Sequence, residues 1–234
     1  MSGDANLDLL TKRVAALYVA DAHGRLVSTN EWDARPAPRF HLMLTASGPI
    51  RRFRGDLSDD LIRALEAICR QEPTRVPGPD LPVMRRELLH ALGKHGEVER
   101  VWCGPAYRLP AKAKLEAEVV LIHEGNARLL ERGFPDWLAD IPHRQPFTAV
   151  VGDGHAVSIC ASVRISAAVH CAGVETHADH RRRGHALRAV AGWATAVRTL
   201  GATPFYSTSW DNIASQTVAQ RLGFDMVGVD FHVT

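Results

Sequence analysis

The sequence has few cysteines and no long run of apolar residues. Its 234 residues include four cysteines, which lie far apart and form no C-x-x-C pair: Cys69, Cys103, Cys160 and Cys171. Since no secretory apolar segment opens the sequence, we expect reduced thiols and a cytoplasmic protein. A membrane-spanning helix needs roughly 20 consecutive apolar residues, and no segment approaches that length, so we expect no membrane role.

The chain also lacks a strong excess of either charge. It has 28 Lys and Arg against 26 Asp and Glu, which gives a formal net charge of +2. A protein whose main partner is nucleic acid usually has a much more basic balance. We therefore expect no nucleic-acid partner, while a local anion site stays open. The hydrophobic fraction of 46% is enough for a globular core.

The N-terminal region has the pattern of a small α+β domain. Residues 14–19 and 25–28 are rich in strand-forming side chains and flank Gly24, which predicts a hairpin. Strands are also predicted at residues 40–45 and 50–54, on either side of a turn.

Helices follow these strands. Ser58 is a predicted N-cap for a helix over residues 59–69, which Pro73 stops. A second helix is predicted at 84–92, and a short strand at 98–103 that Gly104 and the following proline end.

A small, charged segment at residues 110–115 predicts a domain boundary. We place an N-terminal α+β domain at residues 1–112 and a second domain at 113–234. The first domain is expected to shape an acceptor site or to mediate a homodimer.

The C-terminal region begins with a predicted strand at 119–122 and a short helix at 126–130. Strands at 147–151, 156–162 and 169–176 then follow in series, which is typical of an antiparallel meander. A helix at 184–200, with Gly201 in the left-handed position after it, precedes a strand, a helix and a final strand; these lie at 203–208, 212–222 and 226–233.

Chemistry is suggested by residues 174–186, VETHADHRRRGHA, where a strand passes through a polar loop into a helix. The first N–H groups of a helix have no intrahelical acceptor and carry the positive end of its dipole, so they can bind a pyrophosphate. Gly184 and Ala186 are small enough for phosphates to approach the backbone. Residues 181–183, all arginine, add positive charge at the same point.

The pattern Arg181-x-x-Gly184-x-Ala186 resembles the acyl-CoA pyrophosphate loop of the GNAT superfamily, Q/R-x-x-G-x-G/A. The order of the surrounding elements is also similar to that family, including the Asn212-Ile-Ala-Ser215 helix start. The resemblance covers residues 147–234 and extends weakly to 119, and segments 174–177 and 209–212 resemble one bacterial subgroup.

The resemblance implies a GNAT-type α/β fold with a mixed central sheet, preceded by the smaller α+β domain. It also implies acetyl-CoA as the cofactor, and transfer of an acetyl or short acyl group to an amine of a small molecule or peptide. The implied pyrophosphate contacts are the Arg181 side chain and the backbone amides of Arg182, Arg183, Gly184, His185 and Ala186. Val174 and Thr176 would contact the pantetheine arm through their backbone, and Asn212 and Ser215 would lie near the sulfur.

The general base has two candidates, Glu175 and His170. Strand alternation places them on opposite faces, so at most one is expected to face the substrate, and Glu175 is favoured. Many GNAT enzymes carry a tyrosine as general acid where this chain has Ala219. A leaving thiol with a pKa of roughly 8.5 tolerates incomplete protonation, and water or Tyr206 could serve instead.

Other interpretations remain beside these. His177, His180 and His185 lie close in sequence, yet no ligand set completes a zinc spacing, so we expect exposed histidines and no metal. Two further classes stay open: a non-catalytic acyl-CoA-binding or regulatory protein, favoured by Ala219, and a nucleic-acid-binding module that uses the arginines, disfavoured by the near-neutral charge.

Overall fold

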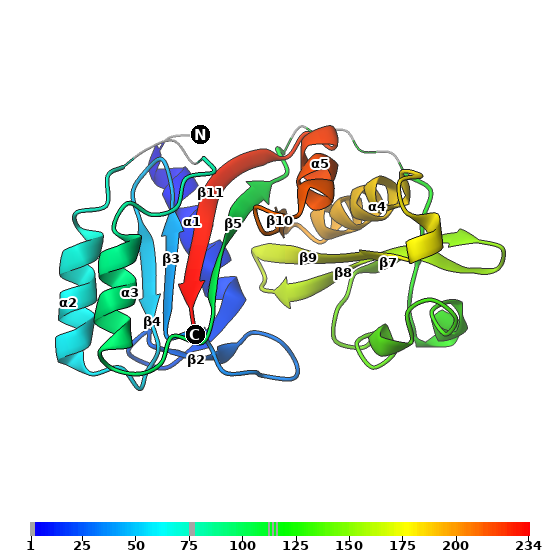
Figure 1. Cartoon of the computed structure of the whole chain (residues 1–234). Helices are drawn as coiled ribbons and strands as arrows, with labels where there is room; N and C mark the ends of the chain where they lie inside the picture. The colour runs from blue at the N-terminus through cyan, green and yellow to red at the C-terminus, as the bar shows by residue number, and fades with distance from the viewer. Residues whose placement is uncertain (1–2, 75–77, 112, 114, 116) are drawn as a thin grey trace. The chain divides into compact units, whose positions relative to one another are not determined.

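The computed structural model describes residues 3–74, 78–111, 113, 115 and 117–234. The chain divides into two compact units (Figure 1), and each is interrupted in sequence. Unit 1 comprises Met1–Tyr107, Ser207–Asn212 and Met226–Thr234, and unit 2 comprises Arg108–Tyr206 and Ile213–Asp225. The predicted boundary at 112/113 falls where residues 112 and 114 lie outside the described part, and it stays a prediction.

The first helix of unit 1, α1 (Gly3–Leu17), was not predicted, and the strand predicted from residue 14 is wrong over 14–17. Leu10, Arg13 and Val14 are all at most 1% exposed, so burial recurs at helical spacing and places them on one face. A strand would have buried alternate residues instead.

The predicted hairpin is confirmed in a shorter form. β1 (Tyr18–Ala20) pairs with β2 (Leu26–Thr29) in an antiparallel arrangement, and Gly24 between them has a φ of 75°. A left-handed φ of this kind suits glycine, which explains its place in the turn.

Unit 1 has a sheet in the order β4-β3-β11-β5. The predicted strands at 40–45 and 50–54 are confirmed as β3 (Phe40–Leu44) and β4 (Ile50–Phe53), which pair antiparallel. The final strand β11 (Asp225–Val233) runs antiparallel beside β3, so the C-terminal end of the sequence completes the N-terminal unit.

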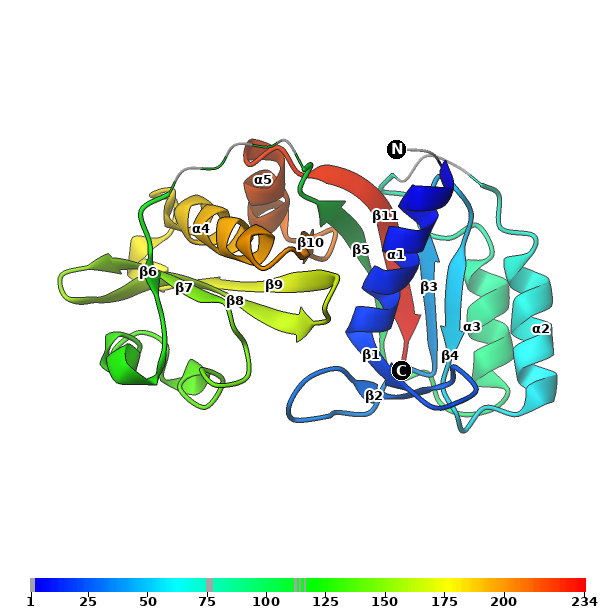
Figure 2. The ribbon, with the colours of Figure 1, turned by 180° about the vertical axis from the view of Figure 1, so that it is seen from behind.

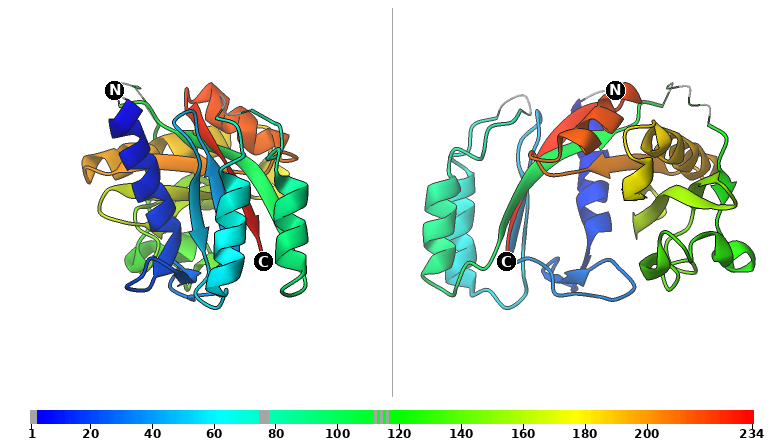
Figure 3. Two further views of the ribbon diagram at one scale, coloured as in Figure 1. Left: turned by 90° about the vertical axis from the view of Figure 1, so that its left-hand side faces the viewer. Right: turned by 45° about the vertical axis from the view of Figure 1, so that its right-hand side comes forward.

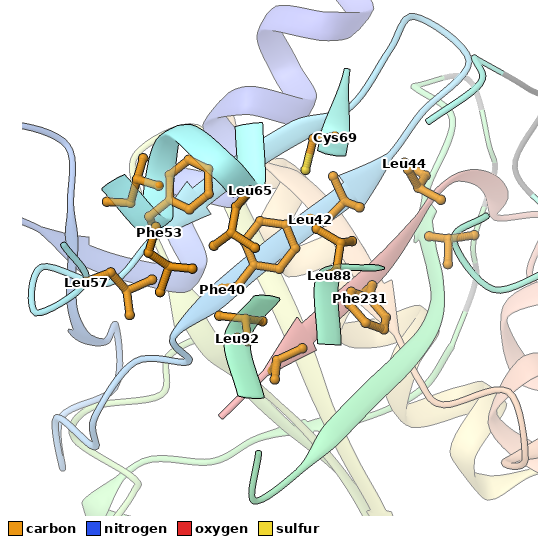
Figure 4. Packing of buried hydrophobic residues seen from close by; sticks show 14 residues of the cluster. Phe40, Leu42, Leu44, Phe53, Leu57, Leu65, Cys69, Leu88, Leu92 and Phe231 are labelled. Atoms are coloured by element: carbon orange, nitrogen blue, oxygen red, sulfur yellow. The ribbon is translucent and has the colours of Figure 1, made fainter. Parts of the chain in front are cut away.

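Two helices pack on one face of this sheet, and α1 lies on the other (Figures 2 and 3). The predicted helices are confirmed as α2 (Asp59–Cys69) and α3 (Arg85–Gly93), and the Ser58 side chain accepts from the Leu61 N–H at 3.3 Å as the N-cap. Figure 4 shows the core between α2, α3 and the sheet, where Phe40, Leu65 and Leu88 are 0% exposed.

The fourth strand, β5 (Val101–Arg108), corrects the expectation that Gly104 and Pro105 end it. The strand continues through both residues, and Gly104 lies against the Thr208 backbone carbonyl, where a Cβ would collide. The Pro105 carbonyl in turn accepts from the Thr208 N–H at 3.3 Å. Close approach of two backbones, rather than a turn, therefore requires glycine at this position.

Unit 2 has strands in the order β10-β9-β8-β7-β6. The predicted meander is confirmed: β7 (Phe147–Gly152), β8 (His155–Ile165) and β9 (Val169–Thr176) pair antiparallel in series, and β6 (Val120–Leu121) pairs with β7. β10 (Thr203–Ser207) is parallel to β9, so the sheet is mixed, as predicted.

Helix α4 (His185–Thr199) covers one face of the meander, and short 3-10 helices cover the other (Figures 1 and 2). The Thr148 hydroxyl of β7 donates to the Ala189 carbonyl of α4 at 3.0 Å. The opposite face packs against η1 (Glu124–Leu129) and η2 (Pro135–Trp137) through a cluster that includes Phe134 and Phe147.

The remaining predicted elements of unit 2 are also present. α4 ends before Gly201, whose φ of 79° confirms the predicted left-handed position, and α5 is Ile213–Arg221. In the part of the chain that is described, no helix has both the length and the hydropathy to span a bilayer.

Candidate functional site

Strand β9 separates from β10 before it separates from β8. Its pairing with β10 runs from Val169 opposite Thr203 to Cys171 opposite Phe205. Its pairing with β8 continues to Thr176 opposite Ser158. The last residues of β9 thus extend beyond its paired stretch with β10. They leave a strand edge to which an extended ligand could hydrogen-bond.

The backbone groups of Val174 and Thr176 point to that edge. The N–H of His177 donates to the Val157 carbonyl at 3.0 Å, so in an antiparallel ladder Glu175 also bonds toward β8 and its two neighbours bond the other way. Val174 and Thr176 are the two residues expected to contact a pantetheine arm, and their backbone orientation suits that role.

The loop after β9 is bent by two residues with left-handed backbone. η3 (Ala178–His180) begins it, then Arg182 has a φ of 60° and Gly184 a φ of 80°. The Arg181 Nε donates to the Thr176 carbonyl at 3.2 Å, which ties the loop to the strand end and occupies one of the outward carbonyls. Arg182 is not glycine, so its conformation costs energy, on the order of 1–3 kcal/mol, that the surrounding loop must offset.

The N-terminus of α4 is left open to an anion. Gly184 is the N-cap and has no side chain to accept from the first turn, and that turn carries no acidic residue. The first backbone bond runs from the Arg188 N–H to the Gly184 carbonyl, so the N–H groups of His185 and Ala186 have no intrahelical acceptor. α2, by contrast, has a serine cap and two acidic residues in its first turn.

Positive charge surrounds this helix end. Arg181, Arg182 and Arg183 are all exposed, and a Cβ on Gly184 would meet no atom within 4 Å. Helix N–H groups without an intrahelical acceptor, the positive end of the dipole and three exposed arginines lie within six residues of sequence, a combination that suits a pyrophosphate.

Four histidines gather beside the loop. The ring of His180 lies 6.3 Å from that of His155, 5.9 Å from that of His177 and 6.1 Å from that of His185, between centroids. Among the described residues no group of three or more His, Cys, Asp or Glu is arranged to hold a metal ion, and the expectation of no metal stays a prediction. His155 comes from the start of β8 and had no sequence signal.

Burial lowers the pKa of His185, and the nearby Arg188, His180 and Arg183 lower it further. Its imidazole is therefore uncharged at neutral pH. Protonation at lower pH would add a further positive charge at the start of α4.

The two candidate bases lie on opposite sides of β9, as predicted. His170 is 6% exposed, and its Nδ1 is 2.9 Å from the Ser162 hydroxyl, to which the Trp193 Nε1 also donates at 2.9 Å. Burial lowers the pKa of His170. Glu175 is exposed, and its carboxylate accepts from the Trp137 Nε1 at 2.7 Å. Trp137 was missed, because no spacing in the sequence connects it to Glu175.

Asn212 and Ser215 lie at the start of α5, where the chain passes from unit 1 to unit 2. The Asn212 N–H donates to the Ser209 carbonyl at 3.2 Å, and Ser215 is half-buried. Ala219 is 0% exposed and Tyr206 is 2% exposed. The roles expected of these residues stay predictions.

Three of the four cysteines do not suit nucleophilic catalysis. Burial raises the pKa of the Cys69 and Cys103 thiols to about 11 and that of Cys160 well above its ordinary value. These groups are protonated thiols at neutral pH, whereas a nucleophile needs the thiolate.

A family model matches part of the second half of the chain. Residues 148–229 match the family model described as GNAT acetyltransferase. No curated protein matches the sequence.

Solved structures match the chain at low sequence identity. A GCN5-related N-acetyltransferase-like protein from Streptococcus suis 89/1591 is 16% identical, with 96% of this chain and 98% of that chain covered at a TM-score of 0.50. A putative GNAT acetyltransferase from Novosphingobium aromaticivorans DSM 12444 is 17% identical, with 58% of this chain and 66% of that chain covered at a TM-score of 0.48. The aminoglycoside N-acetyltransferase AAC(6')-Iy, solved in complex with CoA, is 21% identical, with 47% and 92% covered at a TM-score of 0.39.

The Streptococcus suis protein shares a GNAT-like fold over nearly the whole of this chain, and the mixed sheet of unit 2 fits that fold. A separate N-terminal domain is not distinguished by these likenesses. The loop that is open to an anion lies inside the matched segment, as does the strand end that precedes it. Over residues 148–229 the chain is therefore similar to the GNAT acetyltransferase family.

Proposed function

We propose that this protein is an acyl-CoA-dependent N-acyltransferase that moves an acetyl or short acyl group directly to an amine. The observation that carries the proposal is the N-terminus of α4, where a left-handed Gly184, free backbone N–H groups and exposed arginines meet inside the family-matched segment. Members of this family are typically acyl-CoA-dependent N-acetyltransferases, so the anion that this helix end suits is the pyrophosphate of acetyl-CoA.

The residues present fit acetyl-CoA. Arg182, Arg183 and the first turn of α4 would hold the pyrophosphate, and Gly184 has open space on the side where a Cβ would stand. Val174 directs its backbone N–H and carbonyl, and Thr176 its N–H, to the strand edge, which suits the amide groups of a pantetheine arm. Arg181 would serve the pyrophosphate and also brace Thr176.

Transfer requires an amine that has lost its proton, and we assign that step to Glu175. Its exposed carboxylate, acting as general base, takes a proton from the acceptor ammonium and becomes the carboxylic acid. Acetyl-CoA, when bound, would supply the acyl group: the amine nitrogen would bond to the carbonyl carbon, the C–S bond would break with its electron pair left on sulfur, and the second amine proton would pass to that thiolate, directly or through water or Tyr206. His170 is less suited, because it is buried and already bonded to Ser162.

The chain has no tyrosine at the position of the usual general acid, where Ala219 is buried. A thiol with a pKa of roughly 8.5 is a good leaving group as the thiolate, so the reaction does not depend on a strong acid at that point. Water or Tyr206 remain the candidates for the final proton.

The acceptor is proposed to be an amine of a small molecule or peptide. Transfer is tested by following CoA release from acetyl-CoA against a panel of primary amines, with native protein, Glu175→Gln and Glu131→Gln. We expect Glu175→Gln to lose most of the rate with at least one amine, and Glu131→Gln to keep it. An undiminished rate in Glu175→Gln would remove Glu175 from the mechanism.

A second candidate function is acyl-CoA binding without catalysis, and Ala219 favours it. This alternative predicts acetyl-CoA binding that depends on Gly184, together with no CoA release above background for any amine. Nucleic-acid binding would instead show an affinity that falls steeply as salt is raised.

A further inference from the structure

The indole of Trp137 is held on several sides. The Arg144 guanidinium carbon lies 5.1 Å from the ring centroid, and the Phe147 ring meets it edge-on at 5.8 Å. A Cβ on Gly173 would come within 3.2 Å of the indole Cη2, so the strand backbone closes another side. An aromatic ring packed in this way has little freedom to rotate.

Arg144 is itself held in place. Its Nε is 3.0 Å from the Asp140 carboxylate, and the two side chains are only 16% and 11% exposed. A cation over an indole face gains electrostatic attraction that strengthens when the pair is shielded from water. The orientation of Trp137 is therefore set by Arg144 in the segment that leads into β7, by Phe147 in β7 and by the backbone of β9.

The indole presents one polar atom, and that atom meets the proposed base. Trp137 Nε1 donates to Glu175 Oε2 at 2.7 Å, across 38 residues of sequence. Indole N–H can only donate, and a carboxylate can accept at both oxygens, so Oε1 stays available for a proton. An exposed glutamate without such a bond would sample several rotamers.

We infer that Trp137 is a positioning residue for the transfer reaction: it holds the Glu175 carboxylate in one orientation, with Oε1 directed to the acceptor ammonium. This inference rests on the proposed function. A neutral donor orients the carboxylate without the counter-charge that a lysine or arginine would bring. The indole N–H takes no part in proton transfer, since the proton passes from the ammonium to Oε1 and the indole nitrogen keeps its hydrogen.

The first test asks whether the hydrogen bond exists in solution. The indole N–H resonance of Trp137 is assigned in a ¹⁵N-labelled protein by its loss in Trp137→Phe, and is then followed in Glu175→Gln. We expect this resonance to move in Glu175→Gln while the other indole resonances stay in place. An unmoved Trp137 resonance would overturn the inference.

The second test asks whether the bond matters for the reaction. Trp137→Phe keeps a ring against Arg144 and Phe147 but removes the N–H. With methylamine as the probe acceptor, we expect kcat to fall on the order of tenfold, as for loss of a hydrogen bond to a charged group, with the KM for acetyl-CoA unchanged.

Coupling separates positioning from a general loss of structure. In a Glu175→Gln background, Trp137→Phe should cause no further fall in kcat, because the two residues act through one contact. Trp32→Phe, at an indole that is 51% exposed in unit 1, is the control and should leave kcat unchanged. Equal falls in both backgrounds, or no difference between native protein and Glu175→Gln, would contradict the positioning role. Acetyl-CoA binding is measured in every variant. If binding persists while the positioning role is contradicted, the cofactor site of the proposed function still stands.

Discussion

A buried ion pair in unit 1 offers a sharp test of how this fold is stabilised. Arg13 of α1 makes two bonds to the Asp230 carboxylate of β11, at 2.8 Å and 2.6 Å, and His41 Nε2 lies 3.2 Å from the same group. The side chains of Arg13 and Asp230 are 1% and 4% exposed. Asp230→Asn would leave the guanidinium buried without its counter-charge, which costs about 3–5 kcal/mol of unfolding free energy.

The same helix carries a matched control. Lys12 is 2.7 Å from Asp8, a distance similar to that of the buried pair, but those side chains are 54% and 62% exposed. Surface pairs of this kind contribute about 0–1 kcal/mol, so Asp8→Asn should change stability little. Both substitutions replace a carboxylate by a neutral amide, and the two sites differ in burial.

The assay is urea unfolding at pH 7, followed by circular dichroism. We expect Asp230→Asn to lower the midpoint by on the order of 1–2 M urea, and Asp8→Asn to leave it nearly unchanged. Arg13→Met combined with Asp230→Leu should recover much of the loss, since an apolar pair needs no desolvation. A midpoint for Asp230→Asn within error of that for Asp8→Asn would refute the reasoning.

The pH dependence supplies an independent check. Burial alone would raise the pKa of Asp230, but the charge of Arg13 and the bond from His41 outweigh burial and hold that pKa well below its ordinary value. The unfolded carboxyl binds its proton near pH 4, so the stabilisation is complete above about pH 4 and is lost as pH falls toward the lower folded-state pKa. The acid dependence of the unfolding free energy should be shallower in Asp230→Asn.

Two further predictions concern the loop and strand β5. Burial and cationic neighbours lower the pKa of His185, so its imidazole gains a positive charge only as pH falls from 7 to 5, and acetyl-CoA should bind more tightly over that range. Calorimetry should find a weaker pH dependence of this binding in His185→Gln. An identical pH dependence in both proteins would show that His185 does not face the anion. Gly104→Ala places a Cβ against the Thr208 carbonyl and should destabilise the protein by about 1–3 kcal/mol in thermal unfolding. Gly93→Ala is its control, since a Cβ there meets nothing within 4 Å and should be neutral or slightly stabilising, and equal melting of the two variants would contradict the close packing of β5.

Local patterns predicted much of unit 2. The meander and α4 follow from strand and helix periodicity, and Gly201 was recognisable because a left-handed residue is needed after a helix. The loop at residues 181–186 carries a compact signal, since its glycine, arginines and helix start are contiguous in sequence.

Tertiary contacts were not predictable from such patterns. Val14 has a β-branched side chain and favours a strand locally, but burial of one helical face beside Leu10 makes it part of α1. Gly104 has the appearance of a stop signal and instead permits close backbone approach. Trp137 lies 38 residues from its partner Glu175, so only the folded chain joins them.

The most direct test of the account is calorimetric titration with acetyl-CoA of native protein, Gly184→Glu and Gly154→Glu. The two glycines have φ values of 80° and 78°, and a Cβ at either meets nothing within 4 Å, so the substitutions carry similar backbone strain and the same added charge. We expect native protein and Gly154→Glu to bind alike, and Gly184→Glu to bind at least about tenfold more weakly, a loss of roughly 1.4 kcal/mol or more. No binding by the native protein, or equal binding by both variants, would contradict an acyl-CoA site at the start of α4.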